Sequence, residues 1–189
     1  MKKIGIVTDS HSSISQEEAK KLGIFVLPMP FYIDGECYYE SVTLSRELFF
    51  EKLTSGADIS TSQPSPTAVM EIWDKALEEY EKILYMPISS GLSSSYNTAM
   101  MLAQEEKYEG RVLVVDDGQV AAPLHQMILD TLDMIEKGYE AEQIRELLEK
   151  AGDRMMIYIA LQTLECLKKG GRVTPAAAAL GSVFNIKPI

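Results

Sequence analysis

The sequence is poor in the residues that mark disulfide-stabilised folds and metal proteins. Its 189 residues include two cysteines, two histidines and one tryptophan. Cys37 and Cys166 lie far apart and form neither a CxxC pair nor a metal-ligand spacing, so we expect reduced thiols in a cytoplasmic protein. His11 and His125 are too few and too widely separated for a metal site. We therefore expect no disulfide framework and no cofactor.

Positive charge and long apolar runs are also scarce. Eighteen lysines and arginines stand against 28 aspartates and glutamates, which gives a net charge of -10. Nucleic-acid binding needs a basic surface, so this class of function is excluded. The apolar run at residues 4–7 is too short for a signal peptide, and no run approaches the roughly 18 residues of a membrane-spanning helix. We expect a soluble protein without stable membrane insertion.

What is present is ample material for a core, arranged as alternating strands and helices. Hydrophobic residues make up 46% of the chain. Buried strands are predicted at 3–8, 24–27, 83–86, 111–115 and 155–160. Helices are predicted at 15–23, 44–54, 66–80, 95–106, 122–137, 141–150, 161–169 and 175–180. This alternation predicts an α/β fold with a parallel sheet.

The domain organisation follows from where these elements run out. We expect a Rossmann-like N-terminal α/β lobe over residues 1–152 and the start of a second α/β lobe over residues 153–189. Asp34-Gly35, between two apolar runs, predicts a β-hairpin inside the first lobe. The segment after Gly152 has too few elements to close its own core. We therefore expect the second lobe to be incomplete in this sequence.

Hydroxyl-rich segments stand where strands give way to helices, at residues 8–10, 61–65 and 89–95. Ligands collect at the carboxyl ends of parallel strands, and free N–H groups at helix starts favour anions there. Hydroxyls add uncharged donors that suit a carboxylate or a phosphate. Each segment taken singly is equally explained as a helix cap or a turn. Residues 89–95 carry more hydroxyls than one cap uses, and Gly91 lets the backbone approach a ligand closely.

Two further segments are weaker candidates for a functional site. The Gly170-Gly171 turn in residues 167–174 either aims Arg172 or Thr174 at a cleft or simply ends a helix. Asp116 and Asp117 are adjacent on an extended chain, so their side chains point to opposite faces and do not share a metal ion.

Five motifs together resemble those of the DegV family in order and spacing. They lie at residues 6–10, 61–65, 88–93, 167–172 and 186–189, and the resemblance covers essentially the whole chain. It implies a two-lobed α/β protein that buries one long-chain fatty acid, such as palmitate or stearate, between its lobes. It also implies a carrier that is not itself an enzyme and that presents the acyl carboxylate to a separate kinase subunit.

The same resemblance implies the site residues. Thr61 and Ser93 would hold the carboxylate, with support from Ser62 and from backbone amides near Gly91, and Arg172 would shape the cleft. The full set of ligand-binding residues expected in this way is Thr61, Ser62, Ser90, Gly91, Ser93, Ser94 and Arg172. At residues 116–119 the sequence departs from the family pattern, which puts a polar role there in doubt.

Two other functions remain open at this point. A small phosphotransferase or hydrolase could use the serine-rich loops, but it would need a base near Ser90 or Ser93 that the sequence does not reveal. A partial protein could also serve only as an interaction surface.

Overall fold

A computed structural model describes residues 2–40, 42–159 and 164–174 of the chain. The helical turn predicted at 175–180 and the extended segment at 185–189 lie outside these residues. Residues 161–163, which begin the helix predicted at 161–169, also lie outside the described residues.

The main sheet has four strands in the order β2-β1-β6-β7, and every neighbouring pair is parallel. Its strands are β1 (Lys2–Asp9), β2 (Phe25–Leu27), β6 (Tyr80–Met86) and β7 (Val112–Val114). Residues 4–9 of β1 and 83–86 of β6 are all buried, as expected for central strands covered on both faces. This arrangement confirms the predicted α/β class with a parallel sheet.

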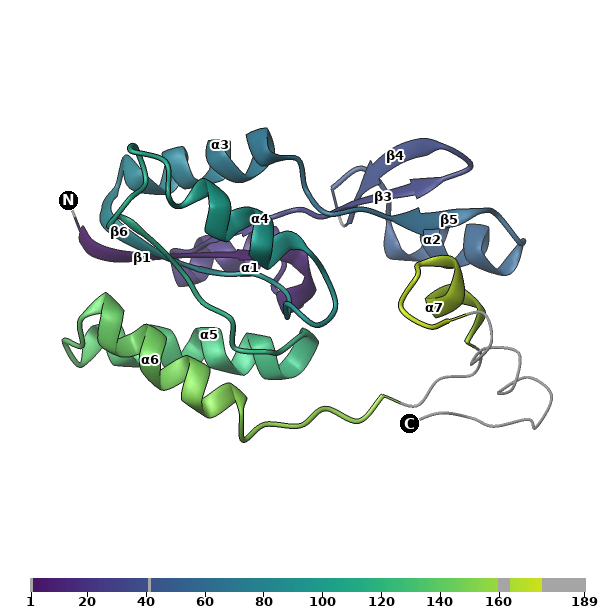
Figure 1. Cartoon of the computed structure of the whole chain (residues 1–189). Coiled ribbons are helices and arrows are strands. Elements are labelled where there is room, and N and C mark those ends of the chain that lie inside the picture. The colour runs from purple at the N-terminus through teal and green to yellow at the C-terminus, as the bar shows by residue number, and fades with distance from the viewer. Residues whose placement is uncertain (1, 41, 160–163, 175–189) are drawn as a thin grey trace.

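Helices cover both faces of this sheet and make three layers (Figure 1). One core contains residues of α1 (Gln16–Leu22), α5 (Ala121–Glu136) and α6 (Ala141–Gly152). The other contains residues of α3 (Pro66–Leu77) and α4 (Ser95–Leu102). Successive side chains of a strand point to opposite faces, so β6 contributes to both cores.

A second, smaller sheet lies beyond the carboxyl ends of the parallel strands (Figure 1). Its antiparallel strands are β3 (Pro30–Ile33), β4 (Glu36–Tyr39) and β5 (Ile59–Thr61), in the order β4-β3-β5. Asp34 and Gly35 both have positive φ values, 52° and 85°, as a two-residue hairpin turn of this hand requires. The predicted hairpin is therefore confirmed.

Short helices complete the described residues. The 3₁₀-helix η1 (Ser10–Ser12) follows β1 directly. Helix α2 (Arg46–Thr54) begins after its cap Ser45 and has no buried residue. Helix α7 (Glu165–Lys169) lies near the small sheet, where Lys169 forms an ion pair with Asp58 at 3.1 Å.

Several predicted elements differ from the structure. Residues 59–61, which belong to none of the predicted strands or helices, form β5. The helix predicted at 95–106 ends at Leu102. The helix predicted at 66–80 ends at Leu77, because Tyr80 already begins β6. Of the strand predicted at 155–160, residues 155–159 pair with no strand among the described residues. Met156 and Tyr158 are 74% and 76% exposed, so this segment has no covered face of the kind a strand there would need.

Candidate functional site

A cavity of about 580 Å³ lies between the carboxyl ends of the parallel strands and the small antiparallel sheet. Residues of η1, α2, β3, β5 and the loop after β6 line it, together with Arg172. The volume falls in the range of pockets that bind small organic ligands, about 300–1,000 Å³. This position, outside the carboxyl ends of a parallel sheet, is where open α/β folds bind ligands.

About half of the residues that line the cavity are apolar. The side chains include an aromatic cluster in which Phe49 lies edge-to-face with Phe31 at 5.4 Å and with Phe50 at 5.6 Å between ring centroids. Aliphatic and thioether side chains from both sheets and the adjoining loops complete the wall: Ile14, Val26, Met29, Leu44, Ile59 and Ile88. Such a wall suits a hydrocarbon ligand.

The polar lining is mostly uncharged. Thr61 and Ser62 enter from the end of β5, and Ser93 enters from the loop before α4. The Ser62 hydroxyl donates a hydrogen bond to the carbonyl of Gln63 at 3.0 Å. The Ser93 hydroxyl is 2.8 Å from the hydroxyl of Ser95. These groups are donors that can hold an anion without a neutralising counter-ion.

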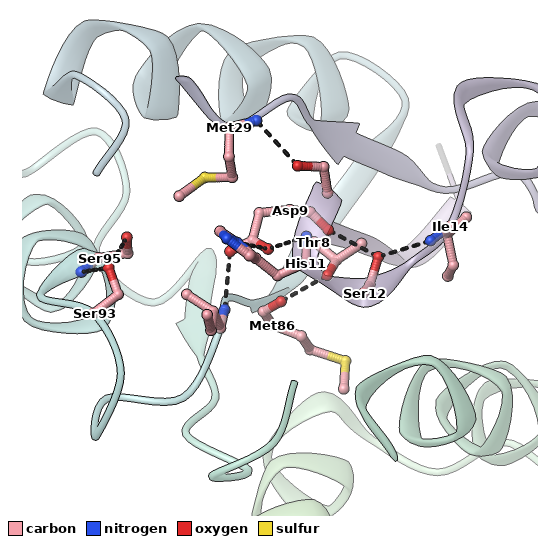
Figure 2. Close-up of polar contacts among 11 residues, drawn as sticks. Thr8, Asp9, His11, Ser12, Ile14, Met29, Met86, Ser93 and Ser95 are labelled. Carbon is pink, nitrogen blue, oxygen red and sulfur yellow. Dashed lines mark hydrogen bonds and ion pairs between the residues drawn. The ribbon is translucent and has the colours of Figure 1, made fainter. Parts of the chain in front are cut away.

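A buried carboxylate organises the end of β1 beside the cavity. Asp9 is fully buried, and its Oδ2 accepts a hydrogen bond from the backbone N–H of Ile88 at 2.9 Å. Its Oδ1 accepts from the backbone N–H of His11 at 2.9 Å and from Nδ1 of the same residue at 3.1 Å (Figure 2). Asp9 thereby ties the end of β1 to the loop after β6 and orients the imidazole of His11.

His11 is the titratable group of this cluster. Burial lowers its pKa, but the hydrogen bond to Asp9 and the nearby carboxylates of Asp9 and Glu40 raise it more, and Arg172 lowers it slightly. The net result is a pKa above the ordinary value of histidine. Protonated His11 is therefore more populated near neutral pH than a free histidine would be.

Three other charged residues line the cavity. Arg172 donates from Nε to the carbonyl of Leu92 at 3.3 Å. The guanidinium of Arg46 lies over the ring of Phe50, 5.7 Å from its centroid. Glu40, just after β4, supplies a negative charge. Two arginines against one glutamate make this region more positive than the chain as a whole.

The structure gathers some of the site residues expected from the sequence and separates others. Thr61, Ser62, Ser93 and Arg172 all line the cavity, although they come from segments far apart in the sequence. Ser90, Gly91 and Ser94 do not line it. Two of their backbone N–H groups are bonded within the protein: that of Ser90 donates to Asp116 at 3.3 Å, and that of Gly91 donates to the Ser89 hydroxyl at 3.2 Å.

Two features of the cavity were not predicted from the sequence: His11 and the aromatic wall. His11 had been considered only as a metal ligand, and the signal that could have found it is its place two residues after Asp9 at the end of a buried strand. Phe31 and Phe49 lie on separate elements that the small sheet brings together. The sequence predicted neither the contact between α2 and β3 nor the strand β5.

The other hydroxyls of the first motif have structural tasks. The Thr8 hydroxyl donates to the carbonyl of Met86 at 2.8 Å, and the Ser10 hydroxyl accepts from the N–H of Met29 at 3.2 Å (Figure 2). Asp9 caps η1 through the N–H of His11. The turn and cap explanation therefore holds for most of residues 8–10.

Among the described residues, no group of three or more histidines, cysteines, aspartates or glutamates is placed to hold a metal ion. Asp116 and Asp117 separate as predicted: Asp116 accepts from the Ser90 N–H, whereas Asp117 is buried and accepts from the Gln119 N–H at 2.9 Å. No helix within the described ranges is both long and apolar enough to cross a bilayer.

Comparison with known proteins gives a consistent result. A family model described as an uncharacterised protein of the DegV family matches residues 3–189. A DegV domain-containing protein of Deinococcus radiodurans is 35% identical over 187 residues, covering 98% of this chain and 66% of the relative. One from Caldanaerobacter subterraneus is 30% identical over 189 residues, covering 100% of this chain and 67% of the relative. The chain thus spans about two thirds of the length of these curated relatives.

Solved structures agree on the fold. A DegV family protein of Thermus thermophilus, described by its fatty-acid binding, is 34% identical and superposes with a TM-score of 0.86, covering 98% of this chain and 66% of that one. A stearic-acid-binding protein of Eubacterium ventriosum is 26% identical, with a TM-score of 0.77 and coverages of 96% and 64%. By sequence motifs, family model and fold, this chain belongs to the DegV family.

Proposed function

We propose that this chain binds one long-chain fatty acid, such as palmitate or stearate, in the cavity between its two sheets. The hydroxyls of Thr61 and Ser93, supported by Ser62, would hold the carboxylate, and the apolar wall would enclose the hydrocarbon chain. The single observation that carries the proposal is that one cavity combines these uncharged donors with an aromatic and aliphatic lining.

The energetics of such a site favour a lipid. Each buried methylene contributes about 0.8 kcal/mol, so a long alkyl chain supplies most of the affinity. A few polar groups then fix the head and the orientation. The fatty-acid binding of the Thermus thermophilus protein and the stearic-acid binding of the Eubacterium ventriosum protein support the same ligand class here.

The wider arrangement is also part of the proposal. Residues 1–152 would form one lobe and residues 153–189 would begin a second, which contributes Arg172 to the cavity, so that the acyl chain would extend from the cavity toward the second lobe. The protein would act as a cytoplasmic carrier without catalysis of its own and would present the carboxylate to a separate kinase subunit. Arg172 lies at the cavity on the segment after α7, where it can shape the exposed end of the site.

The hydrolase or phosphotransferase alternative has less support. A nucleophilic serine needs a hydrogen bond to a base. The Ser93 hydroxyl is instead paired with the hydroxyl of Ser95, and the Ser95 N–H donates to Ser93 at 3.2 Å. Within the described residues, no serine of the 89–95 loop is hydrogen-bonded to a histidine.

The test is lipid occupancy of the purified full chain. Mass spectrometry of the denatured protein should release a long-chain fatty acid, and the double variant Thr61→Ala, Ser93→Ala should retain much less. Each lost donor leaves the buried head group short of a partner, at a cost of about 1–3 kcal/mol. Thr61 caps no helix, and Ser93 contributes to the start of α4 only by accepting from the N–H of Ser95, so circular dichroism should change little.

Ser94→Ala is the matched control, because it removes a hydroxyl from the same loop that does not line the cavity. Its lipid content should equal that of the unmodified chain. Equal occupancy in the double variant would show that the head group lies elsewhere. A chain that releases no fatty acid, and takes up none when palmitate is added, would rule out the lipid-carrier function.

A further inference from the structure

His11 occupies a position at the cavity that the fatty-acid proposal does not yet use. It lies in η1, directly after β1, and lines the same cavity as Ser93 and Arg172. Its side chain is 35% exposed, whereas its partner Asp9 is fully buried. The imidazole therefore stands between a buried carboxylate and the cavity.

The contact with Asp9 fixes which nitrogen carries a proton. Nδ1–H donates to the Asp9 carboxylate, so in the neutral ring Nε2 is unprotonated and can only accept a hydrogen bond. Protonation turns Nε2 into a charged donor. Within the described part of the chain, no hydrogen-bond partner occupies Nε2. The ring can thus offer a ligand either an acceptor or a donor, depending on pH.

The surrounding charges make this choice matter for an anion. Asp9 of β1 and Glu40, just after β4, face His11 with negative charge, and Arg172, after α7, faces it with positive charge. With His11 neutral, these three groups and Arg46, which also lines the cavity, sum to zero net charge. With His11 protonated, the five groups sum to one net positive charge, which attracts an incoming carboxylate.

We propose that His11 is a specificity-determining residue that binds the carboxylate of the fatty acid only in its protonated form, so that affinity increases as the pH falls. This inference rests on the proposed function. The Asp9 hydrogen bond, which already favours the protonated ring, prepares His11 for this role.

Linkage fixes the sign of the effect. A carboxylate beside protonated His11 stabilises the charged ring, so binding raises the pKa of His11. By reciprocity, protonation of His11 strengthens carboxylate binding by the same factor. A charge-assisted hydrogen bond of ordinary strength predicts about a tenfold loss of affinity between about pH 6 and about pH 9, where the ligand carboxylate stays ionised.

The primary experiment uses the full, delipidated chain without any substitution at the site. The two histidines are titrated by NMR in the free protein, with dodecanoate, and with methyl dodecanoate, which lacks the charge; His125→Gln assigns the signals. Dodecanoate should raise the pKa of His11 by about one unit, and the ester should leave it unchanged. His125, which contacts Glu18 on α1 and does not line the cavity, should not respond.

Two variants of His11 then test whether the positive charge of the side chain or its shape determines carboxylate binding. His11→Gln should bind dodecanoate at all pH values with the weak affinity of the neutral form, and His11→Lys should bind without the tenfold pH dependence. If dodecanoate binds but leaves the His11 pKa unchanged, the role of His11 is refuted and fatty-acid binding stands. If neither dodecanoate nor palmitate binds at any pH, the proposed function itself fails, and the role of His11 fails with it.

Discussion

Asp117, in the loop after β7, illustrates what a single buried carboxyl group does to this fold. The residue is 1% exposed, and only its Oδ1 has a partner among the described residues, the Gln119 N–H at 2.9 Å. Burial, together with the carboxylates of Asp116 and Asp9, raises its pKa to about 7. The charged form is therefore disfavoured in the folded protein near neutral pH.

Asp117→Asn should stabilise the protein above neutral pH and have little effect at low pH. In the unfolded chain this carboxyl ionises near its usual pKa of about 3.9, whereas in the folded chain it keeps its proton up to about pH 7. The free energy of unfolding of the parent therefore falls as the pH rises through this window and is level above it. We expect the variant to gain about 2 kcal/mol at pH 8, because the shift of about three units sets an upper bound of roughly 4 kcal/mol.

Urea unfolding of both proteins at about pH 4.5 and about pH 8 measures the difference. Other titrating groups are common to the two proteins and cancel. A difference that is the same at both pH values would show that Asp117 is ionised in the folded state throughout.

At the scale of elements, the sequence was sufficient where local chemistry and burial agree. Ser15 caps α1 and Gly23 ends it, and Pro66 opens α3 after its cap Ser65, in agreement with the predicted range 15–23 and the predicted start at residue 66. Residues 59–61 were missed because β5 is short and half polar, and its strand state comes from pairing with β3. Residues 155–159 show the converse: their apolar run indicates a need for cover, and no partner strand lies among the described residues.

The site residues also divide into those that the sequence predicts and those that it does not. Thr61, Ser93 and Arg172 were accessible from motifs, because each belongs to a recognisable segment. His11 was not, since its significance comes from Asp9 and from the charges of Glu40 and Arg172, which only the folded chain brings near. Sequence motifs indicate which loops form a site, whereas the protonation chemistry depends on tertiary contacts.

Substitution by alanine should destabilise the fold at Gly152 and should have little effect on stability at Gly91. A Cβ on Gly152, at the end of α6, would lie 2.0 Å from the carbonyl oxygen of Asp117, a backbone atom that cannot move aside easily. The Gln119 side chain bridges the same two segments by donating to the carbonyls of Asp117 and Gly152, each at 3.2 Å. Gly152→Ala should therefore destabilise the fold by about 1–3 kcal/mol or more through overpacking.

Gly91→Ala is the matched control. Its Cβ would meet nothing nearer than the Ser89 hydroxyl at 3.5 Å, which is ordinary contact. Thermal unfolding of the two variants measures the contrast. A Gly152→Ala protein as stable as the parent would mean that α6 can move away from the loop after β7 at little cost.

At the scale of the whole molecule, the cavity lies between two parts of the fold that differ in how much of them is buried. The parallel sheet has buried cores on both faces, whereas α2, which contributes Phe49 and Phe50 to the cavity, has no buried residue. Among the described residues, the Lys169–Asp58 ion pair joins α7 to the segment before β5, and its side chains are 60% and 79% exposed. Such an exposed pair contributes little to stability. The small sheet and α2 therefore depend on what fills the cavity.

Binding of palmitate should accordingly slow backbone hydrogen exchange unevenly. Ligand in hundredfold excess over its Kd adds about 2.7 kcal/mol to any opening that releases it, so exchange in α2 should slow by up to about a hundredfold. Helix α6 contributes no residue to the cavity lining and lies far from α2, so it serves as the internal control (Figure 1). Its exchange should change little, because its local openings do not empty the cavity. Equal slowing in both helices would mean that palmitate is released only by global unfolding, and α2 would then be a permanent part of the core.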